Sequence, residues 1–369
     1  DAFLEKLEAY LEANYNADEV DKTGEIPESV LKGLAELGCF AMKIPSQYNG
    51  LGLSQVNYNR ALHLTGSYCG NLTALLSAHQ SIGVPQPLLM FGTDEQKERF
   101  LPRFRDGAIS AFALTEANAG SDPRAMTTTA TLTEDGTHYV INGEKLWCTN
   151  GTKANVIVVM AVTPPKIVRG KERKQITAFL VEMDTPGVEV VHRCRFMGLK
   201  ALYNGVIRFT DVKIPKENMI LEEGDGLRLA LKTLNTGRLS IPAGVTGSSK
   251  WCMKINRKWT NERVQWGHPI GEHETIAGKQ AKIASDTFAM DAVWKVASTM
   301  ADNKHFDIRL EAAIAKLFNT VAHYEILQQT LQIRGGRGFE TADSLRARGE
   351  EGIAIERLLR DSRVNLIFE

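Results

Sequence analysis

The stretch HYVINGEKLWCTNGTKANVIVVMAVT, residues 138–163, decides the fold class because it holds two strand-like segments with turn residues between them. Residues 138–148 and 155–163 are rich in Thr, Val, Ile and aromatic side chains, and Asn150-Gly151 separates them. Stretches of the same texture surround this segment, at 126–133, 176–183, 188–195 and 204–212. Short strands separated by Gly, Pro, Asn and Asp are typical of an antiparallel sheet or barrel. We therefore predict a central antiparallel β-domain over residues 111–222.

Helices are expected on both sides of this β-domain. In the preceding part of the chain, Pro27 suits a first helical turn, and Thr93 with Gln96 fits a capping box. Beyond the β-domain, apolar residues at a period of 3.6 predict long helices, over 225–260, 273–303 and 307–334. Because helices and strands do not alternate, the order disfavours a doubly wound nucleotide-binding sheet.

The predicted fold class is therefore α+β and mainly helical. It consists of an N-terminal helical domain at residues 1–110, the β-domain at 111–222, and a C-terminal four-helix bundle at 223–369 that we expect to be truncated at its end.

The composition excludes several classes of function. Lys plus Arg and Asp plus Glu both number 44, so no global field recruits nucleic acid or an anionic membrane. The five cysteines are odd in number and never form a C-x-x-C pair, which favours a reducing compartment and argues against a disulfide framework or a zinc site. We predict no metal site and no transmembrane segment.

Two segments offer groups that suit a polar, flat ligand. FALTEANAGSD, residues 112–122, is dense in Thr, Ser, Asn and Gly, whose hydroxyls and approachable backbone N–H groups suit a ligand ring or a phosphate. In INGEKLWCTNG, residues 141–151, Trp147 and Thr149 would share one face of a strand, so an aromatic plane would sit beside a hydroxyl. Each segment taken alone is more commonly a connecting loop or a core tryptophan.

Two further stretches lie near the end of the sequence. QIRGGRGF, residues 332–339, is not a dinucleotide-binding fingerprint, because the third required Gly falls on Thr341 and no strand precedes it. Its Gly-Gly turn can still let a phosphate or ribose approach the backbone. RDSRVNLIFE, residues 360–369, ends on Glu369. A glutamate at such a position is normally an exposed side chain without a catalytic role.

Taken together and in this order, these segments resemble the acyl-CoA dehydrogenase family over essentially the whole chain. The signals are TE-x-x-AGSD, W-x-TNG, the Gln-Ile-x-Gly-Gly-x-Gly-Phe stretch and the closing Ile-Phe-Glu. Within the family, AHQSIG at 78–83, KQITAFLVE at 174–182 and LEAAIAKLF at 310–318 are most similar to the long-chain and very-long-chain branch.

The resemblance implies FAD as the cofactor, held between the β-domain and the bundle. The residues implied to line the flavin are Phe112, Leu114, Thr115, Gly120, Ser121, Trp147 and Thr149. Those implied to reach the pyrophosphate and adenosine from a neighbouring subunit are Arg263, Gln265, Gln332, Gly335 and Gly336. The substrate positions are Ser121, Asn235, Arg238 and Phe368, and the catalytic base is Glu369. Gln265 departs from the family's common Thr.

The implied reaction is the α,β-dehydrogenation of a long-chain fatty acyl-CoA to the trans-2-enoyl-CoA. Glu369 would take the α-proton, the β-hydride would pass to N5 of FAD, and an electron-transfer flavoprotein would accept the electrons. A homodimer or homotetramer is expected. The location would be cytoplasmic in a bacterium and the mitochondrial matrix in a eukaryote.

Two alternatives stay open on the sequence alone. A flavin acyl-CoA oxidase would return the electrons to oxygen, and a non-catalytic assembly or scaffold protein could keep the fold without the activity. A nicotinamide dehydrogenase is disfavoured by the missing fingerprint. Residues 340–356 form an insertion relative to shorter members of the family, which we interpret as a solvated excursion.

Overall fold

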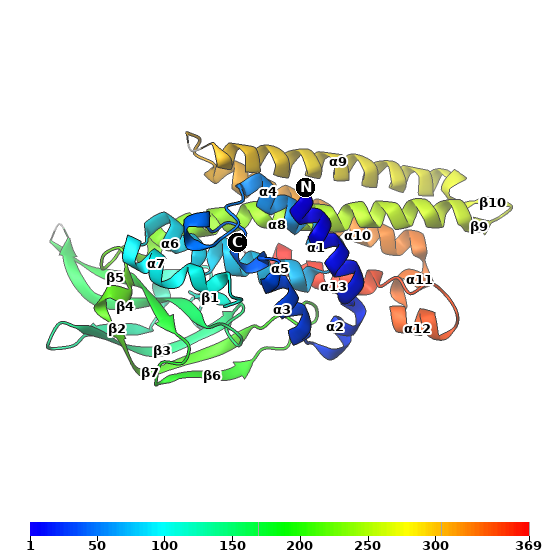
Figure 1. Ribbon diagram of the computed structural model, residues 1–369. Coiled ribbons are helices and arrows are strands. Elements are labelled where there is room, and N and C mark those ends of the chain that lie inside the picture. Colours follow the sequence, from blue (N-terminus) through cyan, green and yellow to red (C-terminus); the bar gives the residue numbers. More distant parts are fainter. Residues whose placement is uncertain (169, 304, 369) are drawn as a thin grey trace.

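The computed structural model describes residues 1–168, 170–303 and 305–368. It contains an N-terminal group of helices, a β region and a C-terminal group of long helices, in that order along the chain (Figure 1). Glu369, the predicted catalytic base, lies outside the described residues. No helix in the described ranges is long and apolar enough to cross a membrane.

Seven α-helices precede the β region. They are α1 (Ala2–Asn14), α2 (Ala17–Thr23), α3 (Glu28–Glu36), α4 (Gln55–Tyr68), α5 (Gly70–Ser77), α6 (Pro85–Phe91) and α7 (Asp94–Phe100). Pro27 stands directly before α3. The predicted capping box begins α7: the side chain of Thr93 accepts from the Gln96 N–H, and the side chain of Gln96 accepts from the Thr93 N–H. A π-helical turn, η3 (Ala78–Ile82), continues α5.

The β region forms one sheet in the order β6-β7-β3-β2-β4-β5-β8, with β1 beside β4. The strands are β1 (Ser110–Ala113), β2 (Thr129–Leu132), β3 (His138–Cys148), β4 (Val156–Val168), β5 (Lys171–Glu182), β6 (Val188–Arg193), β7 (Gly205–Pro215) and β8 (Met219–Ile220). The six predicted strands are confirmed. The sheet is not purely antiparallel as predicted, however, because β1 and β2 both pair with β4 in parallel, and β1 was not predicted at all.

The long helices of the C-terminal part are α8 (Gly226–Glu262), α9 (Glu274–Asp302) and α10 (Arg309–Arg334), close to the predicted ranges. Shorter helices follow: α11 (Gly336–Phe339), α12 (Ala342–Ala347) and α13 (Ile355–Ser362). The three long helices pack on one another, α13 packs on α10, and α4 lies along α8. Between α8 and α9 a short hairpin, β9 (Val264–Gln265) with β10 (His268–Pro269), projects from the end of the bundle (Figure 1).

Single turns of 3-10 helix complete the chain. They are η1 (Cys39–Ala41), η2 (Ser46–Tyr48), η4 (Pro102–Phe104), η5 (Pro123–Ala125), η6 (Lys216–Asn218), η7 (Ile270–Glu272) and η8 (Arg363–Leu366).

The insertion at 340–356 is docked against the rest of the chain, so its interpretation as a solvated excursion was wrong. Leu345 of α12 is fully buried, and Arg346 forms an ion pair with Asp18 of α2. Arg348 donates to Glu340 at 2.7 Å and pairs with Glu350. The arginines of the insertion are thus neutralised by carboxylates of the same chain.

Candidate functional site

Strand β1 brings the first two predicted segments side by side. The Leu146 N–H donates to the Thr115 carbonyl at 2.9 Å, and the Cys148 thiol lies 3.6 Å from the Phe112 carbonyl. The Lys145 ammonium donates to the Leu114 carbonyl at 3.2 Å. The backbone of residues 112–115 therefore runs along residues 145–148, although they lie more than thirty positions apart in the sequence.

Trp147 lies in a β-bulge and not in the regular strand that was predicted. The pairing of β3 with β7 shifts register between Lys145 and Cys148, and Trp147 adopts φ of 53° in this bulge. Thr149 lies beyond the end of β3, and its hydroxyl donates to Asn204 at 3.3 Å. The argument that regular alternation puts Trp147 and Thr149 on one strand face was therefore wrong. The bulge instead leaves the indole 58% exposed, and available to a flat ligand.

A buried ion pair, which the sequence analysis did not identify, fixes the loop that follows β1. The Lys145 ammonium lies 2.7 Å from the Glu116 carboxylate, and the two side chains are 0% and 5% exposed. Glu116 also accepts from the N–H groups of Thr127 at 2.6 Å and Thr128 at 3.1 Å. Burial by itself would raise the pKa of Glu116, but these hydrogen bonds together lower it to about 2. The sequence offered one signal for this pair: Glu116 and Lys145 are opposite charges in the two predicted ligand-binding segments, 112–122 and 141–151.

The loop beyond Glu116 leaves its backbone open. Gly120 and Ser121 are exposed, and a Cβ built on Gly120 meets no atom within 4 Å. Asp122 closes the loop by accepting from the Arg124 N–H at 3.1 Å. Space beside an exposed glycine backbone lets a ligand approach the N–H groups closely.

The turn η3 connects β1 to α8. His79 of η3 bonds to the Ser110 hydroxyl at 2.8 Å through Nδ1 and to the Phe40 carbonyl at 2.8 Å through Nε2. Burial lowers the pKa of His79 to about 4, so this histidine is neutral and its ring nitrogens are used structurally. On the other side of the turn, a Cβ built on Gly237 of α8 would lie 2.8 Å from Ile82. The predicted substrate residues Asn235 and Arg238, which share a hydrogen bond of 3.1 Å, flank Gly237 on the helix that η3 packs against.

The last described residues of the chain contact α10. The buried Lys316 ammonium of α10 donates to the Phe368 carbonyl and lies 5.1 Å from the centre of the Phe368 ring. The neighbouring Ala315 packs against Leu239, which follows Arg238 on α8. Ile367 and Phe368 are 71% and 38% exposed among the residues that the structure describes.

The remaining predicted cofactor residues gather at the opposite end of α8. This helix starts against β5, where Gly226 packs on Thr177, and ends at Glu262, directly before Arg263. At 37 residues it is about 55 Å long, since an α-helix rises about 1.5 Å per residue. Arg263 lies 5.9 Å from the ring of Trp259 at this end of α8, and the Trp259 N–H donates to the Ile333 carbonyl at the end of α10. Gln332, Gly335 and Gly336 adjoin Ile333 in the sequence, and Gln265 belongs to the hairpin β9–β10, which projects from this end of the bundle (Figure 1). A single chain therefore holds the two predicted groups of cofactor residues well apart.

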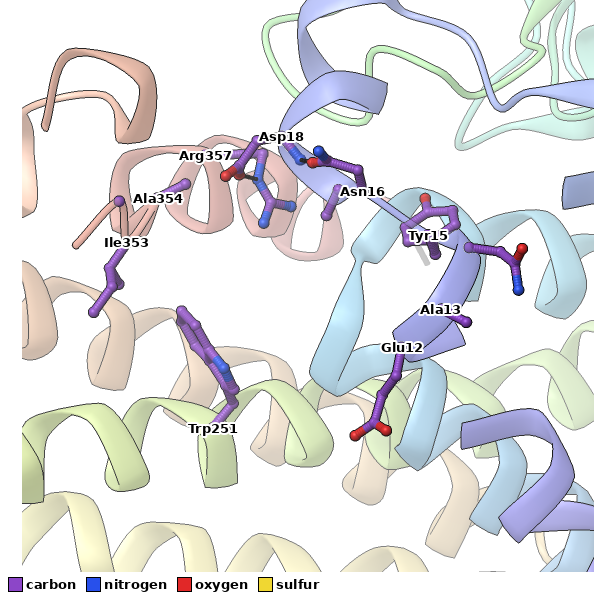
Figure 2. Close-up of a pocket in the computed structure, with 12 residues that line it drawn as sticks. Glu12, Ala13, Tyr15, Asn16, Asp18, Trp251, Ile353, Ala354 and Arg357 are labelled. Carbon is purple, nitrogen blue, oxygen red and sulfur yellow. Dashed lines mark hydrogen bonds and ion pairs between the residues drawn. The ribbon is translucent and has the colours of Figure 1, made fainter. Parts of the chain in front are cut away.

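A groove of about 460 Å³ lies elsewhere, between the α1–α2 connection, α8 and the segment before α13. Figure 2 shows Tyr15, Trp251 and Arg357 around it, with Arg357 paired to Asp18. None of the residues that line it belongs to either predicted group, so this groove is separate from the candidate site.

Three family models match consecutive parts of the chain. The N-terminal, middle and C-terminal domain models of acyl-CoA dehydrogenase match residues 1–108, 111–212 and 224–369, respectively. These matches agree with the order of helices, sheet and helices described above.

Individual relatives bear the same family name. The probable acyl-CoA dehydrogenase FadE10 of Mycobacterium tuberculosis is 52% identical over 369 residues, which are 100% of this chain and 56% of that protein. The mitochondrial very long-chain specific acyl-CoA dehydrogenase of Rattus norvegicus is 36% identical over 351 residues, 95% of this chain and 52% of that protein. The chain thus spans about half the length of the curated relatives it matches.

A solved structure supports the fold. The acyl-CoA dehydrogenase from Bacillus anthracis, complexed with FAD, superposes with a TM-score of 0.87 at 29% identity, covering 100% of this chain and 63% of that chain. This likeness confirms the predicted fold class.

Proposed function

The chain belongs to the acyl-CoA dehydrogenase family, and we propose that it is the FAD-binding catalytic part of an enzyme that dehydrogenates long-chain fatty acyl-CoA. The observation that carries this proposal is the junction of β1 with the β3 bulge. There an exposed Trp147 indole, the backbone of residues 112–115 and the open loop at Gly120 lie together. The three domains that we propose are residues 1–110, 111–222 and 223–369.

The residues of this junction fit a flavin. A flat, conjugated ring needs an aromatic surface to pack on and hydrogen-bonding groups at its edge, and Trp147 with Thr115 and Thr149 offers both kinds of group. Gly120 and Ser121 leave room for backbone contact with a polar part of the ligand. When bound, FAD supplies the acceptor for the hydride that leaves Cβ of the substrate.

The substrate in this proposal lies between η3 and α8. Asn235 and Arg238, with Ser121, contact the CoA part, and Phe368 borders the reacting end. Glu369 accepts the α-proton of the thioester. The preceding residue, Phe368, accepts from the buried Lys316 ammonium of α10, which supports a position for Glu369 beside the bundle.

Cofactor binding requires at least two copies of the chain. Arg263, Gln265, Gln332, Gly335 and Gly336 serve the FAD of the neighbouring copy, because α8 separates them from the junction of β1 and β3 in their own chain. We propose a homodimer or homotetramer. An electron-transfer flavoprotein is the proposed acceptor, in the cytoplasm of a bacterium or the mitochondrial matrix of a eukaryote.

The decisive experiment is an anaerobic titration of the purified protein with acyl-CoAs of increasing length, following flavin absorbance. Bleaching of the flavin band by long-chain acyl-CoA is expected. A colourless protein that takes up no added FAD contradicts the proposal. Oxygen consumption during turnover, in place of reduction of an added electron-transfer flavoprotein, would show the oxidase alternative.

A further inference from the structure

The last turn of α13 is held by contacts with all three parts of the chain. Arg360 donates to the Asp21 carboxylate of α2 through two bonds, of 2.7 and 3.0 Å. The next residue, Asp361, is 4% exposed and accepts from the Leu199 N–H, between β6 and β7, at 2.6 Å. Hydrogen bonds to charged groups are stronger than neutral ones. These two side chains therefore join α13 firmly to the N-terminal helices and to the β region.

The third contact is with the bundle. Ser362, which follows Asp361, lies 3.0 Å from Nε2 of His323 on α10. Nδ1 of this buried histidine lies 2.8 Å from the Ser249 hydroxyl of α8. Three consecutive residues of α13 thus bind three parts of the molecule, so a shift of one part relative to the others must disturb this turn.

The loop between β6 and β7 also reaches the proposed flavin site. We call residues 194–204 the bridging loop. Its last residue, Asn204, accepts from the Thr149 hydroxyl at 3.3 Å, and the Tyr203 carbonyl accepts from the Thr152 N–H at 3.2 Å. One end of the loop therefore contacts the segment that the proposed function places at the flavin, while its middle binds α13.

The bridging loop packs backbone to backbone against the end of α13. A Cβ built on Gly198 would lie 2.3 Å from the carbonyl carbon of Arg360, far inside the contact distance of about 3.5–4.0 Å. Arg360 also donates to the Met197 carbonyl at 3.0 Å. Leu199 has φ of 49°, which residues with a Cβ rarely adopt and which persists only where surrounding contacts fix it. The loop and α13 are thus held in one fixed register.

The end of α13 is close in the sequence to the proposed base. Residues 362–368 separate Asp361 from Glu369. Part of this stretch forms the turn η8, and its last carbonyl, that of Phe368, accepts from Lys316 of α10. Because the stretch is short and is held at both ends, its path depends on the position of α13.

We propose that Asp361 and the bridging loop are positioning elements, which set the proposed base Glu369 against the flavin held beside Thr149. These roles rest on the proposed function, which supplies the base and the flavin. Asp361, packed beside Gly198, acts through the base and so governs removal of the α-proton. Asn204 acts through Thr149 and so governs transfer of the β-hydride.

The test compares G198A with G278A, which adds the same methyl group to α9 where no atom lies within 4 Å. Exchange of the α-protons is followed in D₂O with a 3-thia acyl-CoA, in which sulfur replaces Cβ, so that a base can remove the α-proton but no β-hydride can leave. Flavin reduction is followed by stopped flow with the ordinary acyl-CoA. G198A should slow both processes about tenfold or more at unchanged acyl-CoA affinity, since a misplacement of about 1 Å can cost about 10²-fold. G278A should match the wild type.

N204A separates the two roles. It removes the partner of the Thr149 hydroxyl but leaves the backbone bonds of residue 204 in place. Flavin reduction should slow while α-proton exchange continues at the wild-type rate. If N204A and G198A slow the exchange equally, the separate roles are contradicted.

Amide hydrogen exchange of the apoprotein provides a measurement that needs neither cofactor nor activity. Residues 363–368 should exchange about tenfold faster in G198A than in G278A, because the start of this stretch is displaced. Should G198A not fold, R360M, whose side chain is 23% exposed, removes the bonds to Asp21 and Met197 and gives the same comparison.

The remaining outcomes distinguish the two proposals. A wild-type protein that takes up no FAD overturns the proposed function, whereas faster amide exchange at 363–368 in G198A still supports the contact between loop and α13. If the wild type reduces its flavin and both G198A and R360M exchange α-protons and reduce flavin at the wild-type rates, the positioning role alone is overturned. D361N, which keeps an acceptor for the Leu199 N–H, should retain more activity than D361A, and equal losses in the two variants contradict the role of this hydrogen bond.

Discussion

Replacing Lys145 with Met should destabilise the protein strongly. K145M leaves the Glu116 carboxylate, which is 5% exposed, without the ammonium that lies 2.7 Å away. The fall in the pKa of Glu116 from 4.5 to about 2 corresponds to about 3.5 kcal/mol, at about 1.4 kcal/mol for each pKa unit, and the Lys145 ammonium shares this effect with hydrogen bonds from Thr127 and Thr128. Removing one partner of a buried pair typically costs about 3–5 kcal/mol. Because Thr127 and Thr128 keep their hydrogen bonds in K145M, the second value sets the expected loss, about 3–5 kcal/mol at neutral pH.

The sign of the pH dependence follows from the same pair. Because the pKa of Glu116 is lower in the folded protein than in the unfolded chain, its contribution is complete above about pH 4.5 and is lost as the pH falls toward about 2. Burial lowers the pKa of Lys145, but Glu116 opposes this, so the pair remains ionised at neutral pH. Wild-type stability should therefore decline over that acid range.

Urea unfolding of K145M, E116Q and the double variant E116Q/K145M measures the interaction directly. The double variant should lose less than the two single losses combined, since it buries neither charge alone. FAD affinity should fall in K145M as well, because Lys145 also holds the Leu114 carbonyl. A K145M protein that loses less than about 1 kcal/mol, or strictly additive losses, would refute the reasoning.

Three further predictions concern the proposed reaction. E369Q should keep FAD and acyl-CoA binding while flavin reduction slows by about 10²-fold or more in stopped-flow measurements, and a variant that bleaches at the wild-type rate removes Glu369 from the mechanism. R263A should release FAD more readily on gel filtration, because a phosphate loses a charged partner, and a monomer that retains FAD would contradict the shared site. Acyl-CoA affinity should rise by about 0.8 kcal/mol per CH₂ until the slot is full, so a maximum at butyryl-CoA in equilibrium titrations argues against long-chain preference.

Local patterns sufficed for the helices. The three long helices of the C-terminal part follow the apolar period of 3.6 over 26 to 37 residues, enough repeats to locate each within a few positions. The capping box at Thr93 predicted the start of α7 because both of its hydrogen bonds are made within four residues. Such features depend on neighbours in the sequence.

The features that were missed depend on distant partners. β1 has only four residues, SAFA, and forms a strand because it pairs with β4, with Ser110 opposite Val156. No local periodicity predicts this pairing. Trp147 has φ of 53°, a conformation that its residue type rarely adopts and that only the register shift against β7 explains. The Lys145–Glu116 pair joins positions 29 apart. The resemblance supplied the candidate site residues, but it did not predict the contacts that position them.

The dimensions of α8 connect the proposed sites of two copies. Its beginning packs on β5, its first third carries Asn235 and Arg238 of the proposed substrate site, and its last turns carry Trp259, beside Arg263 at the C-cap. If the end of one α8 serves the cofactor of a second copy, two-fold symmetry makes the relation reciprocal, so each chain completes the other's site. Dissociation would then weaken both cofactor sites at once, while each chain would keep its own substrate residues. FAD retention should therefore depend on protein concentration in the same range as the dimer itself, because the two equilibria are linked.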